Sequence, residues 1–338
     1  MTEQDQSFFA NTADRSKWAI GVGGDASSDE LHPQYRQTNP HYALTETQYF
    51  SFHVPDANIS GLLYMWHHPN LGTVSAGPMV FKGVKRDVLR CELLDFRGWM
   101  TDRGLSQDMS SLAFDNGYRV DKLDPNGTFR AQYRDDSRKN MIDVTLTPCS
   151  ERIFWPGGKH FEQVMKTSGT LMLRGEHHDI DGFSIRDRSW GEARMETPAS
   201  MAPPAWITGT FGEDFAFHIT ATDDPALDPM WKDRFEVDRD HILKFGWAIV
   251  DGSPVAITDA RKITRYDKES LFPTRAEITF RDEREREFRV IGTVTAVSPL
   301  PTWHNVRVLI CLVRWECEGR VAFGEIQEVQ WTDFMQDW

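Results

Sequence analysis

The chain has 338 residues, of which 40% are hydrophobic and 26% charged, and this composition excludes low-complexity, collagen-like and disordered chains. Lys and Arg total 38 against 51 Asp and Glu, so the formal net charge is −13. A negative charge of this size is a poor match to nucleic acid and to anionic membranes, both of which recruit cationic surfaces. The length allows two ordinary domains or one large β domain.

Targeting signals are not visible in the sequence. No segment approaches the roughly 20 consecutive apolar residues of a membrane helix, and residues 1–18 lack the basic and apolar regions of a secretory signal. The four cysteines form neither a CxxC pair nor a zinc-ligand spacing. We therefore expect a cytoplasmic protein with reduced thiols and without membrane insertion, one disulfide being the alternative.

Short alternating runs separated by Gly, Pro, Asn and Asp predict β-strands from residue 31 onward, after an N-terminal arm of residues 1–30. In the first half we expect strands at residues 49–54, 62–66, 118–123, 129–133 and 141–146. In the second half we expect them at residues 206–211, 215–220, 243–249, 276–280, 288–294, 306–315 and 321–331. Helical periodicity is weak and confined to residues 85–97.

This spacing of turns is typical of all-β sandwiches and barrels, so the helix content should lie well below the globular average of about a third. About eight strands precede Pro156 and about ten follow it, and either number suits a closed barrel or sandwich. We therefore expect an N-terminal β domain at residues 31–155 and a C-terminal β domain at residues 156–338. The alternative boundary is the Pro- and Ala-containing segment at residues 197–204.

Residues 160–194 hold the densest set of polar side chains. His160 and Glu162 are two residues apart in a predicted strand and therefore share a face. Phe183, Ile185 and Asp187 share a face in the next one, which puts a carboxyl group at the end of an apolar row. Such a carboxyl, removed from water, would hold its proton near neutral pH, as a general acid must.

Arg186 and Arg188 allow a structural interpretation of the same segment. They flank Asp187 on the other face of the strand, and a guanidinium that folds back would keep the carboxylate ionised. Arg-Asp-Arg-Ser-Trp-Gly would then be a buried salt-bridge network, with Gly191 permitting a bulge. Both interpretations stay open at the level of the residues.

The run Glu176-His177-His178-Asp179 has nitrogen and oxygen donors that could bind a metal. It falls between two predicted strands, so we interpret it as a solvated hairpin loop. The same interpretation applies to Trp66-His67-His68-Pro69. We therefore expect no metal and no cofactor.

Several motifs of this segment resemble the hydroxyneurosporene synthase superfamily, the carotenoid 1,2-hydratase-like or AttH-like proteins. The resembling elements are His160-x-Glu162-Gln163, Gly169-Thr170 and Gly182-x-x-x-Arg186-Asp187-Arg188-Ser189-Trp190-Gly191. The resemblance spans most of residues 40–335. It implies two lipocalin-like β domains in tandem.

In hydratases of this family, an Asp at the position of Asp187 protonates an isolated alkene, and a His at the position of His160 supports the site. Here Ile185 stands where the hydratases usually have Tyr, and Glu162 stands where they tend to have an aromatic residue. These departures count against carotenoid hydration itself. They leave open proton-driven chemistry on a different apolar substrate.

The resemblance implies a cofactor-independent hydratase, isomerase or cyclase that acts on a C=C bond of an isoprenoid- or aromatic-like small molecule. Asp187 would be the acid, and His160 and Glu162 would orient it or place water. The residues expected to bind the substrate are Phe183, Arg186, Arg188, Trp190 and Trp247. The alternatives are a non-catalytic carrier of a hydrophobic molecule and a structural partner protein. An enzyme needs Asp187 to face the ligand, whereas a carrier needs only an apolar pocket.

Overall fold

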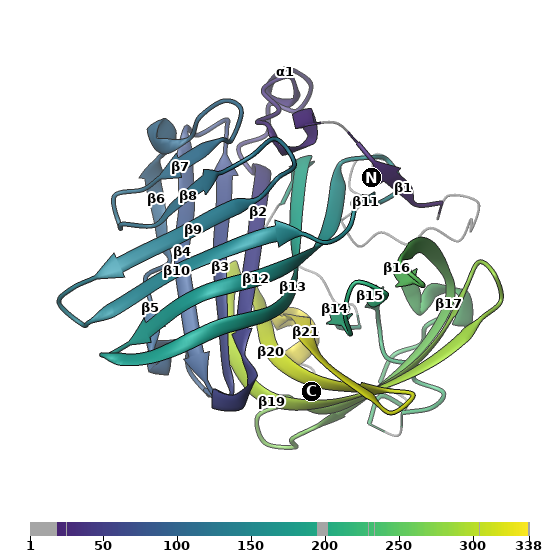
Figure 1. Cartoon of the computed structure of the whole chain (residues 1–338). Coiled ribbons are helices and arrows are strands. Elements are labelled where there is room, and N and C mark those ends of the chain that lie inside the picture. Colours follow the sequence, from purple (N-terminus) through teal and green to yellow (C-terminus); the bar gives the residue numbers. More distant parts are fainter. Residues whose placement is uncertain are drawn as a thin grey trace. The chain divides into compact units, whose positions relative to one another are not determined.

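The computed structural model describes residues 19–24, 26–194, 202–228, 230–232, 234–303 and 305–336 (Figure 1). It is 61% strand and 8% helix, which confirms the all-β prediction. The chain forms two compact units. We call Gly21–Lys82 with Leu89–Met195 the sheet unit, and Glu196–Trp338 with Gly83–Val88 the barrel unit.

The sheet unit is built on one antiparallel sheet of thirteen strands, within the part of the chain that the structure describes. The main path runs β5-β4-β3-β2-β13-β12-β10-β9-β8-β7, β6 pairs with β4, and β11 joins β1 to β12. The strands are β1 (Gly21–Gly23), β2 (Leu44–Val54), β3 (Ile59–His68), β4 (Thr73–Lys82), β5 (Leu93–Leu94), β6 (Arg97–Thr101), β7 (Ser111–Ala113), β8 (Arg119–Lys122), β9 (Phe129–Asp135), β10 (Asn140–Pro148), β11 (Arg152–Phe154), β12 (His160–Leu173) and β13 (Glu176–Ala193). Helical segments in this unit are short, such as α1 (Tyr35–Thr38).

The two faces of this sheet carry different side chains, because successive residues of a strand point to opposite faces. One face, which we call the core face, carries Phe50, Leu63 and Met165, and these belong to the hydrophobic core of the unit. The opposite face, which we call the site face, carries Tyr49 and Glu162. The continuous pairing of β12 with β13 keeps this alternation in register over both strands.

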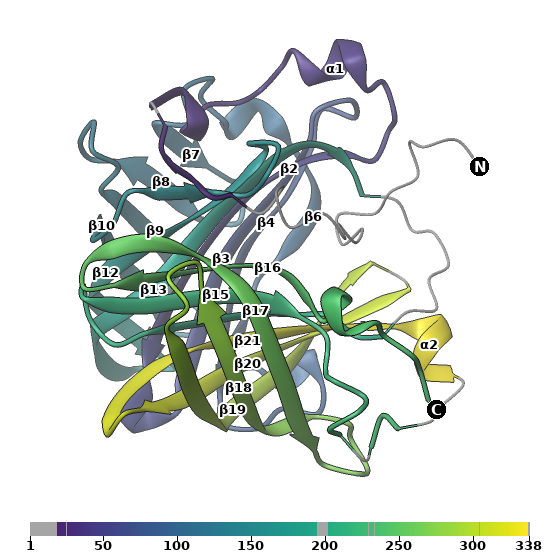
Figure 2. The same cartoon turned by 90° about the vertical axis from the view of Figure 1, so that its right-hand side faces the viewer.

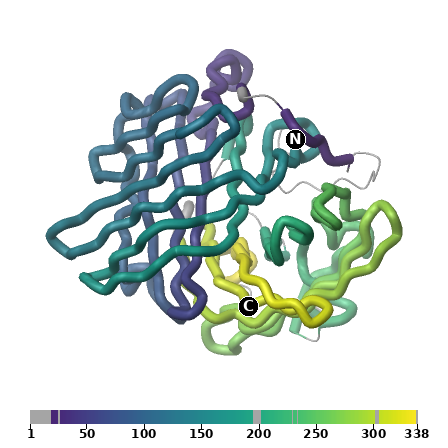
Figure 3. Tube along the Cα trace, viewed as in Figure 1, coloured from purple at the N-terminus to yellow at the C-terminus, as the bar shows by residue number. Residues whose placement is uncertain are grey.

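The barrel unit is a closed antiparallel barrel whose eight strands follow in chain order. Its strands are drawn in green to yellow in Figures 2 and 3. Its interior is filled by apolar side chains, including Phe217, Ile278 and Trp315. The strands are β14 (Ala205–Thr210), β15 (Phe215–Ala221), β16 (Leu243–Val250), β17 (Ser253–Tyr266), β18 (Pro273–Asp282), β19 (Glu287–Trp303), β20 (Val306–Cys317) and β21 (Arg320–Trp331), and α2 (Thr332–Gln336) follows.

The division of the chain differs from the one preferred from the sequence. β12 pairs with β10 and β13 pairs with β2, so residues 160–193 belong to the first unit rather than to a domain that starts at residue 156. The units divide between Met195 and Glu196, beside the alternative boundary at residues 197–204. Of that alternative, residues 197–201 lie outside the described residues.

The expected arm at residues 1–30 is corrected for its last part. β1 pairs with β11, and Asp29 is buried in the sheet unit with ion pairs to two arginines. Residues 1–18 lie outside the described residues. The four cysteines are not joined by disulfide bonds. Among the described residues, no helix is long and apolar enough to cross a membrane.

Candidate functional site

The candidate site lies on the site face of β12, β13 and β2. Glu162 of β12 pairs directly with Asp187 of β13, and Asp187 pairs in turn with Tyr49 of β2. His160 is paired with Ser189 and shares the same face. Directly opposed residues on antiparallel strands have their Cβ atoms about 4.5–5.5 Å apart, and diagonal neighbours such as His160 and Asp187 lie about 7–8 Å apart.

Glu162 is fully buried and forms a carboxylate–imidazole pair with His160. Its Oε1 lies 2.8 Å from His160 Nε2 and accepts a hydrogen bond from Trp155 Nε1 at 2.7 Å. The Trp155 ring also stands edge-on to the His160 ring, with 4.8 Å between centroids. In the tautomer that donates from Nε2, Nδ1 of His160 is the basic nitrogen. Trp155 and Glu162 therefore fix a proton acceptor on the site face.

Asp187 is half-buried, and its nearest cross-strand partner on the Glu162 side is another carboxyl group. Two carboxylates in directly opposed positions repel each other, and this repulsion favours a proton on one of them. Glu162 already accepts two hydrogen bonds from N–H groups, which favour its ionised form. The pairing therefore brings two carboxyl groups together on the site face, with the hydrogen bonds from N–H groups on the Glu162 side.

Aromatic rings extend from Asp187 along the site face. Tyr49 lies edge-on to Tyr64 at 5.1 Å, Tyr64 edge-on to Trp66 at 5.3 Å, and Trp66 edge-on to Phe96 at 5.2 Å. Burial raises the pKa of Tyr64; the Arg194 charge opposes this rise, and the Asp187 charge adds to it. Asp187 is thus within electrostatic reach of the Tyr64 hydroxyl. The sequence analysis missed these rings, because the pairing of β2 with β13 joins residues far apart in the chain.

Arg186 and Arg188 project from the core face, away from Asp187. Arg186 Nη1 donates to Asp29 Oδ1 at 2.8 Å, and its Nε and Nη2 donate to Gln163 Oε1 at 2.9 and 2.7 Å. Arg188 Nη2 donates to the Glu30 carbonyl at 2.6 Å and lies 3.5 Å from Glu46 Oε2. The salt-bridge network considered from the sequence therefore exists, and Asp29 and Glu46 are its acids on the core face.

Asp29 holds this network together as an anion. Burial alone would raise the pKa of its carboxyl, but the charges of Arg186 and Arg152 bring that pKa well below its ordinary value. Arg152 Nη2 donates to Asp29 Oδ2 at 2.6 Å. Because Arg186 and Arg188 are fully buried in this network, the structure corrects their expected role in contacting a substrate beside Asp187.

The remaining predicted contact residues are dispersed. Trp190 stacks on His32, with ring centroids 4.2 Å apart, and lies edge-on to Phe161 on the core side. Phe183 shares the site face with Asp187 and carries Lys166 Nζ 4.8 Å from its ring centroid. Trp247 is fully buried on β16 of the barrel unit.

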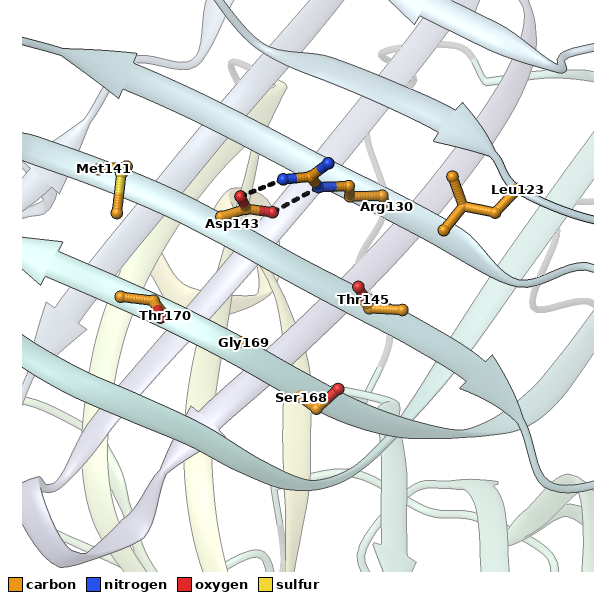
Figure 4. A pocket seen from close by; sticks show the side chains of 8 residues that line it. All are labelled: Leu123, Arg130, Met141, Asp143, Thr145, Ser168, Gly169 and Thr170. Atoms are coloured by element: carbon orange, nitrogen blue, oxygen red, sulfur yellow. Dashed lines mark hydrogen bonds and ion pairs between the residues drawn. The ribbon is translucent and has the colours of Figure 1, made fainter.

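A shallow depression of about 450 Å³ opens on the site face above β9, β10 and β12 (Figure 4). An Arg130–Asp143 ion pair crosses it. Gly169 in its floor has φ +152°, and an added Cβ would lie 2.1 Å from the Asp143 carbonyl oxygen, which explains the glycine of the Gly169-Thr170 motif. The lining is polar and does not suit an apolar ligand. It is formed by Leu123, Arg130, Met141, Asp143, Thr145, Ser168, Gly169 and Thr170.

The run Glu176-His177-His178-Asp179 begins strand β13 instead of forming a loop. His177 Nε2 lies 3.8 Å from Asp179 Oδ1, and His178 Nε2 lies 3.6 Å from Glu176 Oε1. Alternation along the strand sends the two histidines to opposite faces. Over the described ranges, no group of three or more His, Cys, Asp or Glu side chains is arranged to hold a metal ion.

The fold defines an all-β protein that combines a closed eight-stranded barrel with a large antiparallel sheet. Residues 28–333 match the family described as a domain of unknown function, DUF7064, and the chain belongs to this family. A presumed AttH from Nitrosomonas europaea has a similar structure, with a TM-score of 0.53 and 10% identity over 89% of this chain and 97% of that one. The AttH-like fold expected from the sequence is thereby confirmed.

Kievitone hydratase from Nectria haematococca is a more distant structural match. Its TM-score is 0.48, with 10% identity over 93% of this chain and 97% of that one. No curated protein matches the sequence.

Proposed function

We propose that this protein catalyses acid-initiated chemistry on a C=C bond of a hydrophobic small molecule, with Asp187 as the proton donor. The observation that carries the proposal is the direct pairing of Asp187 with Glu162 on a sheet face that also bears His160 and a row of aromatic rings. The motif resemblance identified in the sequence supports the same assignment of the acid.

The proposed first step transfers the Asp187 proton to one alkene carbon. The π electron pair forms the new C–H bond, Asp187 becomes a carboxylate, and the other carbon becomes cationic. The faces of Tyr49, Tyr64 and Trp66 stabilise such a cation through their ring quadrupoles. The apolar side chains of Val164 and Ile185 on the same face disfavour bulk water and suit a hydrocarbon substrate.

The cation is then consumed in one of two ways. Water adds to it and loses a proton to His160 Nδ1, which completes a hydration. Alternatively, an adjacent carbon loses its proton to His160, which completes an isomerisation. The Glu162 carboxylate stabilises the imidazolium formed in either case, because it lies 2.8 Å from Nε2. The proton gained by His160 then returns to Asp187 through water, which restores both side chains for the next turnover.

The test begins with the purified protein and a panel of isoprenoid and phenolic alkenes, with consumption followed by mass spectrometry. Asp187→Asn keeps the shape of the side chain and removes its acidic proton, so turnover should fall about 10²–10⁴-fold. Asp179→Asn is the matched control, because Asp179 lies on the same strand and is largely exposed.

Thermal melts separate catalysis from folding in this comparison. The ion pairs of Arg186 and Arg188 are made with other acids, and turnover is therefore expressed per folded molecule, with the folded fraction of Asp187→Asn taken from its melt. Undiminished turnover per folded Asp187→Asn molecule would show that Asp187 is not the acid. A panel that the protein binds but never converts would favour the carrier alternative.

A further inference from the structure

A buried polar network lies inside the barrel unit, and the proposed chemistry does not use it. Its centre is Asp223, whose Oδ1 accepts hydrogen bonds from Lys262 Nζ and Thr264 Oγ1, both at 2.8 Å. Asp223 Oδ2 accepts from Trp231 Nε1 at 2.9 Å and from the Tyr266 hydroxyl at 2.8 Å. Asp223 and Lys262 are buried, so the ionised pair is desolvated on both sides.

The Tyr266 hydroxyl bridges Asp223 to a second buried acid, Glu328 of β21. Its oxygen lies 2.6 Å from Glu328 Oε2 as well as 2.8 Å from Asp223 Oδ2. A phenol has one hydrogen and can donate it to one of these two oxygens only. If both acids were ionised, the other contact would press two oxygens together without a hydrogen between them. One more proton is therefore needed, and Glu328 Oε2 is the atom that can carry it.

The charges around Glu328 agree with this hydrogen count. Lys262 is fully buried and lies 2.8 Å from Asp223 Oδ1, so its charge is offset by that carboxylate. On the Glu328 side, Oε1 accepts a hydrogen bond from the neutral amide of Gln330 at 2.7 Å. Arg307 of β20 is directed to Gln330 Oε1, to which its Nε donates at 2.9 Å. Other titratable groups near the network include Asp228 in the loop after β15, which lies 3.5 Å from Arg265 of β17. Cys311 on β20 and Glu325 on the outer face of β21 are two more.

We propose that Glu328 is a neutral carboxylic acid in the folded barrel under mildly acidic conditions, with its hydrogen donated to Tyr266, and that its ionisation under mildly alkaline conditions destabilises the barrel unit. The Tyr266 hydrogen then goes to Asp223, so every oxygen–oxygen contact of the network contains one hydrogen. Burial raises the pKa of Glu328 to about 7; the Lys262 charge opposes this rise, and the Asp223 charge adds to it. Burial also raises the pKa of Tyr266, which keeps the phenol protonated.

The direction in which stability changes with pH follows from the pKa of Glu328 in the folded and in the unfolded protein. Its pKa is about 7 in the folded protein against an ordinary 4.5, a difference of 2.5. The stabilisation by the protonated acid is therefore complete below about pH 4.5 and is lost as the pH rises through about 7. The unfolding equilibrium constant should change by roughly 300-fold across this window because of Glu328. In the sheet unit, burial lowers the pKa of His67 and of His68, and these groups act in the opposite direction over part of the same range.

The test is therefore the difference between Glu328→Gln and the wild type as a function of pH. Gln can accept from Gln330 and donate to Tyr266 as the neutral acid does, but it cannot ionise. The two proteins should unfold alike near pH 5, and the variant should become more stable by about two orders of magnitude in the unfolding constant at pH 8. Hydrogen exchange should localise the gain to the barrel strands. Glu287→Gln, at a largely exposed carboxylate of β19, is the control and should show no such trend.

Infrared spectroscopy supplies a second measurement that does not depend on the variant being stable. The wild type at pH 6 should show the C=O stretch of a buried protonated carboxyl group, and titration to pH 9 should remove it. A stability difference that is flat with pH, or a wild-type spectrum without this band, would overturn the proposal. If Glu328→Gln does not fold, the band is recorded in Asp187→Asn, where it should persist because the carboxyl group of Asp187 is then absent.

Discussion

The Asp29 carboxylate offers a direct measure of what holds the core face of the sheet unit together. Asp29→Asn keeps the shape of the side chain but removes the charge that faces Arg186 at 2.8 Å and Arg152 at 2.6 Å. Two charge-assisted hydrogen bonds are weakened, each worth about 1.5–3 kcal/mol, and a guanidinium stays buried without its counter-charge. Breaking a buried pair in this way costs about 3–5 kcal/mol of unfolding free energy.

Urea denaturation measures this loss, with Asp181→Asn as the control. Asp181 is largely exposed and pairs with Lys166, so its replacement should cost less than about 1 kcal/mol. The folded-state pKa of Asp29 is lowered, so its stabilisation is present above its ordinary pKa and disappears as the pH falls below it. The difference between Asp29→Asn and the wild type should accordingly shrink in acid. A loss below about 1 kcal/mol at pH 7, or a difference that does not change with pH, would refute this reasoning.

Two further changes test the geometry around the site. Trp155→Phe removes the second hydrogen bond to Glu162, so we expect turnover to fall about tenfold and the pH–rate profile to shift. An unchanged profile would make Trp155 a packing residue only. Gly169→Ala places a Cβ 2.1 Å from the Asp143 carbonyl oxygen, at a residue with positive φ. The free energy of unfolding, measured by urea denaturation, should fall by about 2–3 kcal/mol. An unchanged stability would contradict the backbone conformation described for β12.

The features that could be predicted from the sequence are those that depend on neighbouring residues. Period-two alternation is local, so it located strands such as β14 and β15, and it correctly put His160 and Glu162 on one face. The same alternation placed Arg186 and Arg188 on the face opposite Asp187.

Long-range pairing could not be predicted in this way. Trp155-Pro156-Gly157-Gly158 has the composition of a domain boundary, but Gly157 and Gly158 adopt positive φ values in a turn between β11 and β12. The pairing of β13 with β2, which adds residues 160–193 to the first unit, leaves no local pattern. The ion pair of Asp29 could not be predicted either, because its partner Arg186 is 157 residues away in the sequence.

The most direct test of the central claim follows the proton that Asp187 transfers to the substrate. The first alkene that the protein converts should be turned over in D₂O and the product examined by mass spectrometry and NMR. Protonation of a C=C bond by Asp187 predicts one deuterium per turnover, bound to the alkene carbon next to the one that becomes cationic. The rate should be about 10²–10⁴-fold lower with Asp187→Asn. A product that forms at full rate without carbon-bound deuterium would contradict acid-initiated chemistry at this site.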